Sequence, residues 1–144
     1  MATIESYRDL EAWQSAINLS LETFALASRL PGSERFELGS QMRKAAVSVP
    51  SNVAEGQASG PGRRYLHHVD IALGSLAELD TQIEIVRRRQ LMSEPILQSI
   101  NQLLQQTARL IYGLRRSLRR RLQMQVGCLA FAVSVSASAA VLLS

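Results

Sequence analysis

The chain has 144 residues, a net charge of +4 and an apolar content of 47%, which suits one domain with a sizeable buried core. Its single cysteine, Cys128, excludes an internal disulfide and a cysteine-based zinc site, and it favours a reducing compartment. The N-terminus has no apolar signal-peptide core, so we expect a cytoplasmic protein.

The charged residues are distributed unevenly. Residues 1–94 hold 10 basic and 12 acidic side chains, whereas residues 95–144 hold six arginines and no acid. Aromatic residues are few, and a core of Leu, Ile, Val and Ala is typical of packed helices rather than of a β-sandwich.

The first predicted helix covers residues 7–29. Leu19 and Leu26 form a second apolar stripe on it, as Leu66 and Leu73 do on the predicted third helix. A single bundle cannot easily bury these stripes together with the larger ones, so we expect an oligomer. The members of the larger stripe recur at spacings of three and four, which places them on one face: Leu10, Trp13, Ile17, Leu21 and Phe24. A proline in the segment 30–33 ends the helix.

The second predicted helix, residues 34–57, contains Pro50. A proline inside a helix removes the backbone hydrogen bond to the carbonyl four residues back, here that of Ala46, and costs about 3 kcal/mol. Asn52 and Glu55 fit a capping box, so the helix is either kinked at Pro50 or restarted after it. A kink is favoured because one apolar face continues across the proline: Leu38, Met42, Ala45, Val49 and Val53.

The third helix is predicted over residues 63–89, after a Gly- and Pro-rich turn, and the fourth begins near Ser93. Both carry apolar seams with alternating steps of three and four: Tyr65, Val69, Ala72, Leu76, Leu79, Ile83 and Val86, then Leu97, Ile100, Leu104, Thr107, Ile111, Leu114 and Leu118. Two such seams joined by a short loop predict an antiparallel hairpin. The predicted fold is therefore all-α, an antiparallel up-down-up-down four-helix bundle over residues 1–122 with an apolar tail over residues 123–144.

The tail is uncharged and mostly apolar from Leu122 to Ser144. Its length reaches the range of a membrane span, and a basic run precedes it, as in a C-terminal membrane anchor. Alternating serines and the lack of Trp and Tyr favour the alternative, an extension that is disordered or that continues the fourth helix.

Four segments carry a family resemblance. Ser48–Gly56 reads SVPSNVAEG and resembles the SIPSNIAEG signature of the four-helix-bundle proteins encoded in intervening sequences of bacterial 23S ribosomal RNA genes. Asp9–Gln14 is similar to the family's DLxVWQ, Leu30–Ala46 to its FPxxE…QlrRAA, and Gly74–Gln82 to its GSLxELxxQ. The segments occur in the family's order, and the resemblance covers about residues 5–120.

The resemblance implies an antiparallel four-helix bundle that assembles as a homopentamer. Accessory variability proteins of diversity-generating retroelements look like relatives, and they bind nucleic acid and a reverse transcriptase. RNA or DNA and a protein are therefore the implied partners, whereas most members of the family have no established biochemical activity. The chain departs from the family pattern at Gly60–His68 and after Leu122.

Two acids, Glu55 and Glu78, lie in matched segments beside Asn52 and Ser75. We interpret these four residues as a structural polar cluster that fixes the register of the second and third helices. Catalytic carboxylates are the alternative, but no nucleophile with a base accompanies them, so we predict that the chain has no catalytic residue and is not an enzyme.

Metal and cofactor sites are not predicted either. His67 and His68 are preceded three residues earlier by Arg64 and Tyr65, so the Glu-x-x-His motif of di-metal bundles is absent. We interpret both histidines as exposed polar residues near a helix start, and no cofactor fingerprint appears.

Arginines near the end of the fourth helix are the candidate nucleic-acid site: Arg109, Arg115, Arg116, Arg119, Arg120 and Arg121. A ring assembly would repeat them around its axis and raise the local potential, although little aromatic interleaving accompanies them. The alternative is a solvated face that complements the helix dipole. Two functions therefore compete: a nucleic-acid-binding accessory protein, and a protein-interaction scaffold that the tail would tether to a membrane.

Overall fold

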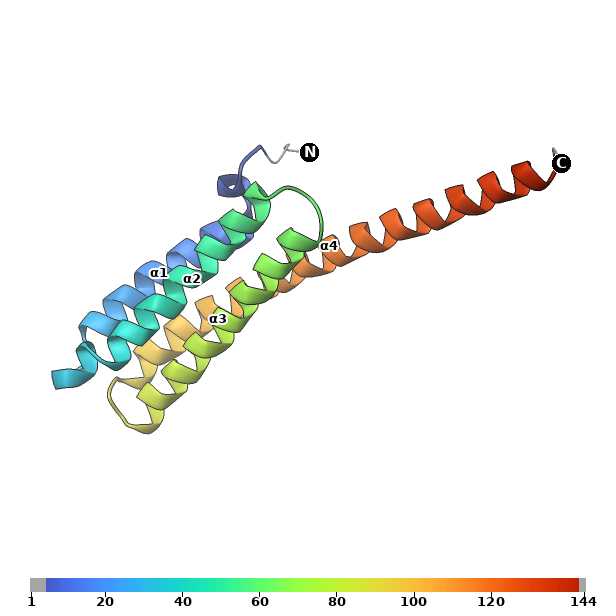
Figure 1. Cartoon of the computed structure of the whole chain (residues 1–144). Helices are drawn as coiled ribbons and strands as arrows, with labels where there is room; N and C mark the ends of the chain where they lie inside the picture. Colours follow the sequence, from blue (N-terminus) through green and yellow to red (C-terminus); the bar gives the residue numbers. More distant parts are fainter. Residues whose placement is uncertain (1–4, 143–144) are drawn as a thin grey trace.

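Four α-helices and two short 3₁₀ turns build the chain in the computed structural model (Figure 1), which describes the backbone of residues 5–142 and the side chains of residues 5–129. In chain order the elements are η1 (Tyr7–Asp9), α1 (Glu11–Ser28), η2 (Gly32–Arg35), α2 (Leu38–Ala58), α3 (Arg63–Arg88) and α4 (Glu94–Leu142). No strand occurs in the described residues, and the predicted all-α class is confirmed.

The helices form a bundle in which each one packs against two neighbours. α1 contacts α2 and α4, and α3 also contacts α2 and α4. Consecutive helices run in opposite directions, as the colours of Figure 1 show. This is the up-down-up-down order that the two seams of the third and fourth helices predicted.

The core consists of the apolar seams of all four helices. Every member of the predicted α3 seam is buried, and in the α4 seam only Leu114 is half-buried rather than buried. Met42, Val49 and Val53 contribute the matching face of α2. Burying one such side chain stabilises the fold by about 1.5–3 kcal/mol, so these seams decide how the helices pair.

The face of α1 that packs inward differs from the expectation. Leu19 and Leu26, which looked like the second stripe, are buried, whereas Leu21 and Phe24 of the larger stripe are 64% and 44% exposed. The buried face combines the two leucines with small side chains, which let α1 approach its neighbours closely: Ala12, Ser15, Ala16, Ser20, Thr23 and Ala27. Of the larger stripe, Leu21 and Phe24 are therefore left on the outside of the bundle, while Leu10, Trp13 and Ile17 are half-buried.

Pro50 lies inside α2, which continues through it without a break. The proline leaves the carbonyl of Ala46 without its helical partner, because proline has no backbone N–H. The hydroxyl of Ser20, on α1, donates to this carbonyl oxygen at 2.7 Å and also lies 2.9 Å from the Ala16 oxygen. A neighbouring helix thus satisfies the group that Pro50 exposes.

The alternative in which the helix restarts at a capping box is wrong. Asn52 lies in the helix interior, and its side-chain amide donates to the Ser48 carbonyl oxygen at 2.9 Å instead of capping a new helix. The kink at Pro50 stays a prediction.

The turns at the two ends of α3 have different chemistry. Before it, Gly60 and Gly62 have φ of +79° and +135°, a region that residues with a Cβ rarely adopt. After it, the Leu91 amide donates to the Val86 carbonyl and the Gln90 amide to that of Arg87, which is a Schellman motif with Gln90 at φ +55°. This second turn reverses the chain into α4.

α4 is longer than its neighbours and projects from the bundle (Figure 1). The exposed fraction of its apolar seam rises along the helix, from 4% at Leu118 to 61% at Val126 and 67% at Leu129. The helix passes the predicted boundary at residue 122 without a break, so the tail continues the fourth helix as far as Leu142.

None of the helices in the described part of the chain combines the length and the apolar character that crossing a lipid bilayer requires. Most of the predicted membrane anchor, residues 130–144, lies outside the residues whose side chains the structure describes.

Candidate nucleic-acid interface

The arginines of α4 lie where this helix leaves the bundle. Five of the six are exposed: Arg109, Arg116, Arg119, Arg120 and Arg121. Arg115 is half-buried, and its Nε lies 2.6 Å from Oδ1 of Asp70 on α3, a close charge contact without the alignment of a hydrogen bond. Among the described residues no ion pair holds the other five, so Arg115 serves the packing of α3 on α4 and the others face solvent.

The exposed arginines cover more than one side of α4. At about 100° per residue, Arg109, Arg116 and Arg120 fall within about 40° of one another on the outermost face. Arg119 lies nearer α3, where it borders a groove. Arg121 lies on the opposite flank, near the buried Tyr65: burial raises the pKa of this tyrosine above its ordinary 10.0, and the positive charge of Arg121 lowers it in part.

The exposed surface of α4 consists of only a few residue types. From Gln98 to Gln123, every exposed residue of the helix is Gln, Ser, Arg or Tyr, and none is acidic. Amide and guanidinium groups donate hydrogen bonds to phosphate oxygens and to base edges, and no carboxylate on this face repels a phosphate. The helix therefore presents a surface suited to a polyanion.

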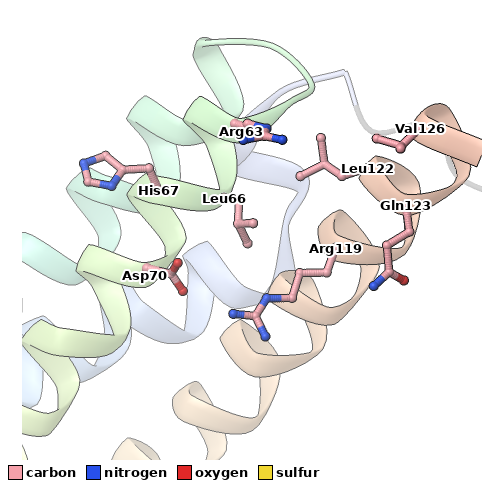
Figure 2. A pocket seen from close by; sticks show the side chains of 8 residues that line it. All are labelled: Arg63, Leu66, His67, Asp70, Arg119, Leu122, Gln123 and Val126. Carbon is pink, nitrogen blue, oxygen red and sulfur yellow. The ribbon is translucent and has the colours of Figure 1, made fainter. Parts of the chain in front are cut away.

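A groove separates the exposed end of α4 from the first turns of α3, with a volume of about 680 Å³. Figure 2 shows its apolar residues, Leu66 on α3 and Leu122 and Val126 on α4. Arg63 and Arg119 stand on its two sides, one from each helix. Arg63 thus extends the basic surface from α4 onto α3.

A second, smaller hollow of about 460 Å³ lies on α4 itself. Its lining consists of Tyr112, Gln123 and four of the predicted arginines: Arg115, Arg116, Arg119 and Arg120. Sequence reasoning did not single out Tyr112 or Arg63. Tyr112 could have been found from its spacing, because it lies three or four residues before Arg115 and Arg116 and thus on their side of the helix.

The predicted polar cluster is arranged around Ser48, between α2 and α3. The hydroxyls of Ser48 and Ser75 lie 2.8 Å apart, and the Asn52 amide donates to the Ser48 hydroxyl at 3.2 Å. Nδ1 of His68 lies 3.1 Å from Oδ1 of Asn52 and 3.6 Å from a carboxylate oxygen of Glu55. These groups satisfy one another.

Glu78 does not join this cluster. Its Oε1 accepts a hydrogen bond of 3.1 Å from the Gln82 amide, one turn further along α3. His68 belongs to the cluster although it was interpreted as an exposed polar residue, and its side chain is in fact only 15% exposed. Its position seven residues before Ser75, on the same face of α3, was the signal in the sequence.

The fold is that of an antiparallel all-α bundle. Comparison with protein families shows which family the chain belongs to. The sequence pattern of the family described as "23S rRNA-intervening sequence protein" matches residues 8–113. The chain belongs to this family. The match contains Arg109 and ends before Arg115, so five of the six α4 arginines lie outside the matched residues.

A solved structure shares the fold. It is the crystal structure of a protein with unknown function from the S23 ribosomal protein family of Bacteroides thetaiotaomicron VPI-5482. The two chains are 16% identical with a TM-score of 0.68, and the likeness covers 73% of this chain and 95% of the other. At this level of identity the similarity shows the fold alone. Among curated proteins no relative matches the chain.

Proposed function

We propose that this protein is a non-enzymatic, homo-oligomeric accessory protein that binds nucleic acid through the exposed arginines of α4. The observation that carries the proposal is the set of five exposed guanidinium groups without an ion-pair partner in the described residues. They span about 18 Å of one helix, and the exposed surface of α4 around them has no acid; the nearby Asp70 of α3, which lines the groove, is paired with Arg115. Arginine binds phosphate oxygens in a bidentate manner, so such a surface suits a phosphate backbone.

RNA is one form of the ligand in this proposal. The family description refers to the intervening sequence of 23S rRNA and names no ligand, so the proposal rests on the arginines. DNA stays the alternative, because phosphate contacts by themselves do not distinguish the two.

Assembly into a homo-oligomer, with a pentamer expected from the family resemblance, is the second part of the proposal. It is supported by the larger stripe of α1, in which Leu21 and Phe24 are exposed and Trp13 and Ile17 are half-buried. We call these four residues the α1 face. Val47 of α2 is also exposed, at 45%. Apolar surface of this kind marks protein contacts, and a protein-interaction scaffold is therefore the competing function.

A salt series tests the nucleic-acid part. The affinity of the full chain for single- and double-stranded RNA and DNA is measured by fluorescence anisotropy at increasing salt, for the wild type and for the triple variant Arg116→Gln/Arg119→Gln/Arg120→Gln. Each phosphate contact contributes roughly 0.7–0.9 to the slope of log affinity against log salt, so the triple variant should lose about 2–3 from that slope. The loss should be the same for all sequences, because phosphate contacts carry no base readout.

The matched control is Arg29→Gln/Arg35→Gln/Lys44→Gln. These residues are exposed and lie just after α1, in η2 and in the first half of α2, away from the C-terminal part of α4. The control variant loses the same total charge as the triple variant. The control should bind like the wild type. Equal slopes for the two triple variants, or binding that does not respond to salt, would overturn the nucleic-acid function in favour of the scaffold.

A further inference from the structure

Tyr112 is placed unlike the other large side chains of the bundle portion of α4. The residue is 54% exposed, on the outer face of the helix. The hollow that it lines is otherwise made of arginines and one glutamine. A flat π surface among guanidinium groups suits a ligand that carries both flat rings and negative charge, which is the chemistry of a nucleotide.

The hollow around Tyr112 adjoins the groove between α3 and α4. Arg119 and Gln123 line both of them, so one ligand that covers these two residues reaches both, and we call the hollow and the groove together the track. The hollow offers an aromatic ring and the groove offers apolar side chains, Leu66, Leu122 and Val126. Guanidinium groups stand along both parts, from Arg116 on α4 to Arg63 on α3.

We propose that the ligand of this surface is a single-stranded nucleic acid, with one base stacked on Tyr112 and a neighbouring base in the α3–α4 groove. This inference rests on the proposed function and specifies its ligand. The phosphates between the two bases lie along Arg116 and Arg119, while Arg63 holds the strand where it reaches α3.

A duplex does not use this track. Its bases are paired and stacked on one another, so that only their edges are accessible in the grooves. Single strands leave the faces of their bases free to stack on aromatic side chains and guanidinium planes. Tyr112 and the apolar part of the groove therefore add affinity for a single strand, whereas the arginines act on both forms.

The test compares Tyr112→Leu with Tyr112→Phe in the full chain. The probes are one short mixed sequence as single-stranded RNA, as single-stranded DNA and as the corresponding duplexes, each with a central 2-aminopurine whose fluorescence falls on stacking. Loss of one base–aromatic stack should weaken single-strand binding by roughly five- to a hundredfold in Tyr112→Leu and relieve the quenching. Tyr112→Phe should retain both, and the affinity for duplexes should change with neither variant.

A second pair of variants tests the groove. Val126→Gln places an amide in its apolar part, and Ile85→Gln makes the same kind of change at an exposed site on α3 that is not in the groove. Only Val126→Gln should weaken single-strand binding. Because both residues are exposed, the fold should tolerate both changes.

The outcomes separate this inference from the proposed function. If Tyr112→Leu binds single strands like the wild type while the arginine variant does not, single-strand stacking is wrong and phosphate binding stands. If Tyr112→Leu weakens single strands and duplexes alike, or changes the size of the oligomer in sedimentation, Tyr112 has a structural role and the inference fails. If no oligonucleotide binds the wild type, both proposals fail.

Discussion

Ser20 and Pro50 form a pair that we expect to be coupled energetically. Ser20→Ala leaves the buried Ala46 carbonyl without a donor, which should lower the free energy of unfolding by about 1–3 kcal/mol. In a Pro50→Ala background, the new backbone N–H can bond to that carbonyl, so the loss on adding Ser20→Ala should be smaller. Urea unfolding of the four proteins of this double-mutant cycle measures the coupling. An additive cycle would mean that the hydroxyl does not serve the orphaned carbonyl.

For single residues, the sequence shows which backbone group lacks a hydrogen-bond partner but not which residue supplies one. The missing hydrogen bond at Ala46 follows from Pro50 alone, because it depends on residues four apart. The donor is 26 residues away from Ala46 on another helix, and no local pattern points to it. The capping box of Asn52 and Glu55 was a plausible local solution, but tertiary packing supplied a different one.

Helix packing predicts opposite signs for substitutions at three helical glycines. A Cβ at Gly56 would lie 2.6 Å from Cδ2 of the buried Tyr65, whereas at Gly74 and Gly113 nothing lies within 4 Å. Gly→Ala gains roughly 0.5–1 kcal/mol in a helix, but overpacking costs about 1–3 kcal/mol. Thermal unfolding should therefore show Gly56→Ala less stable than the wild type, and Gly74→Ala and Gly113→Ala more stable.

Those three variants control one another. All make the same chemical change in a helix, so any difference in sign reports the contact with Tyr65. A stable Gly56→Ala protein would show that the α2–α3 contact yields to one extra methyl group, and that these helices do not set their separation at Gly56.

Periodicity predicts an element well when the seam consists of large apolar residues. On α3 and α4 the residues of the predicted seams mark the buried face, although other large apolar residues of these helices, such as Ile71 and Ile85, are exposed. α1 carries two apolar stripes, and the stripe with more large residues is the less buried one, with Leu21 and Phe24 exposed. Its partner, with Leu19 and Leu26 among small residues, is buried because small side chains permit close helix contact. The size of the side chains alone therefore predicted the wrong buried face for α1.

At the scale of the whole molecule, we expect the α1 face to be a contact between copies of the chain. Leu21→Glu places a charge at a residue that is 64% exposed, so the isolated bundle should tolerate it. In an assembly that buries this residue, an unpaired carboxylate is strongly unfavourable, and the assembly should dissociate. Sedimentation velocity measures this change.

Ile85→Glu serves as the matched control, since Ile85 is an exposed apolar residue on another helix. It should leave the assembly intact. A monomeric wild type would rule out the oligomer, and dissociation of both variants would show that the contact is not confined to the α1 face.

The candidate interface was predictable only in part. The arginines are visible in the sequence because they form a run without acids. That Arg115 is engaged by Asp70 depends on the approach of two helices, as does the addition of Arg63 to the surface. Composition shows few aromatic residues, but it does not show that one of them, Tyr112, lies among the arginines.

The uninterrupted course of α4 gives the arginines and the projecting segment one common helical phase. One extra residue inserted after Leu122 would turn everything downstream by about 100° relative to the bundle and carry Val126 out of the groove. Seven extra residues would restore the orientation to within about 20° and move the segment outward by about 10 Å. The helix therefore sets direction as well as distance, and only insertions close to a whole number of turns keep the orientation of the projecting segment.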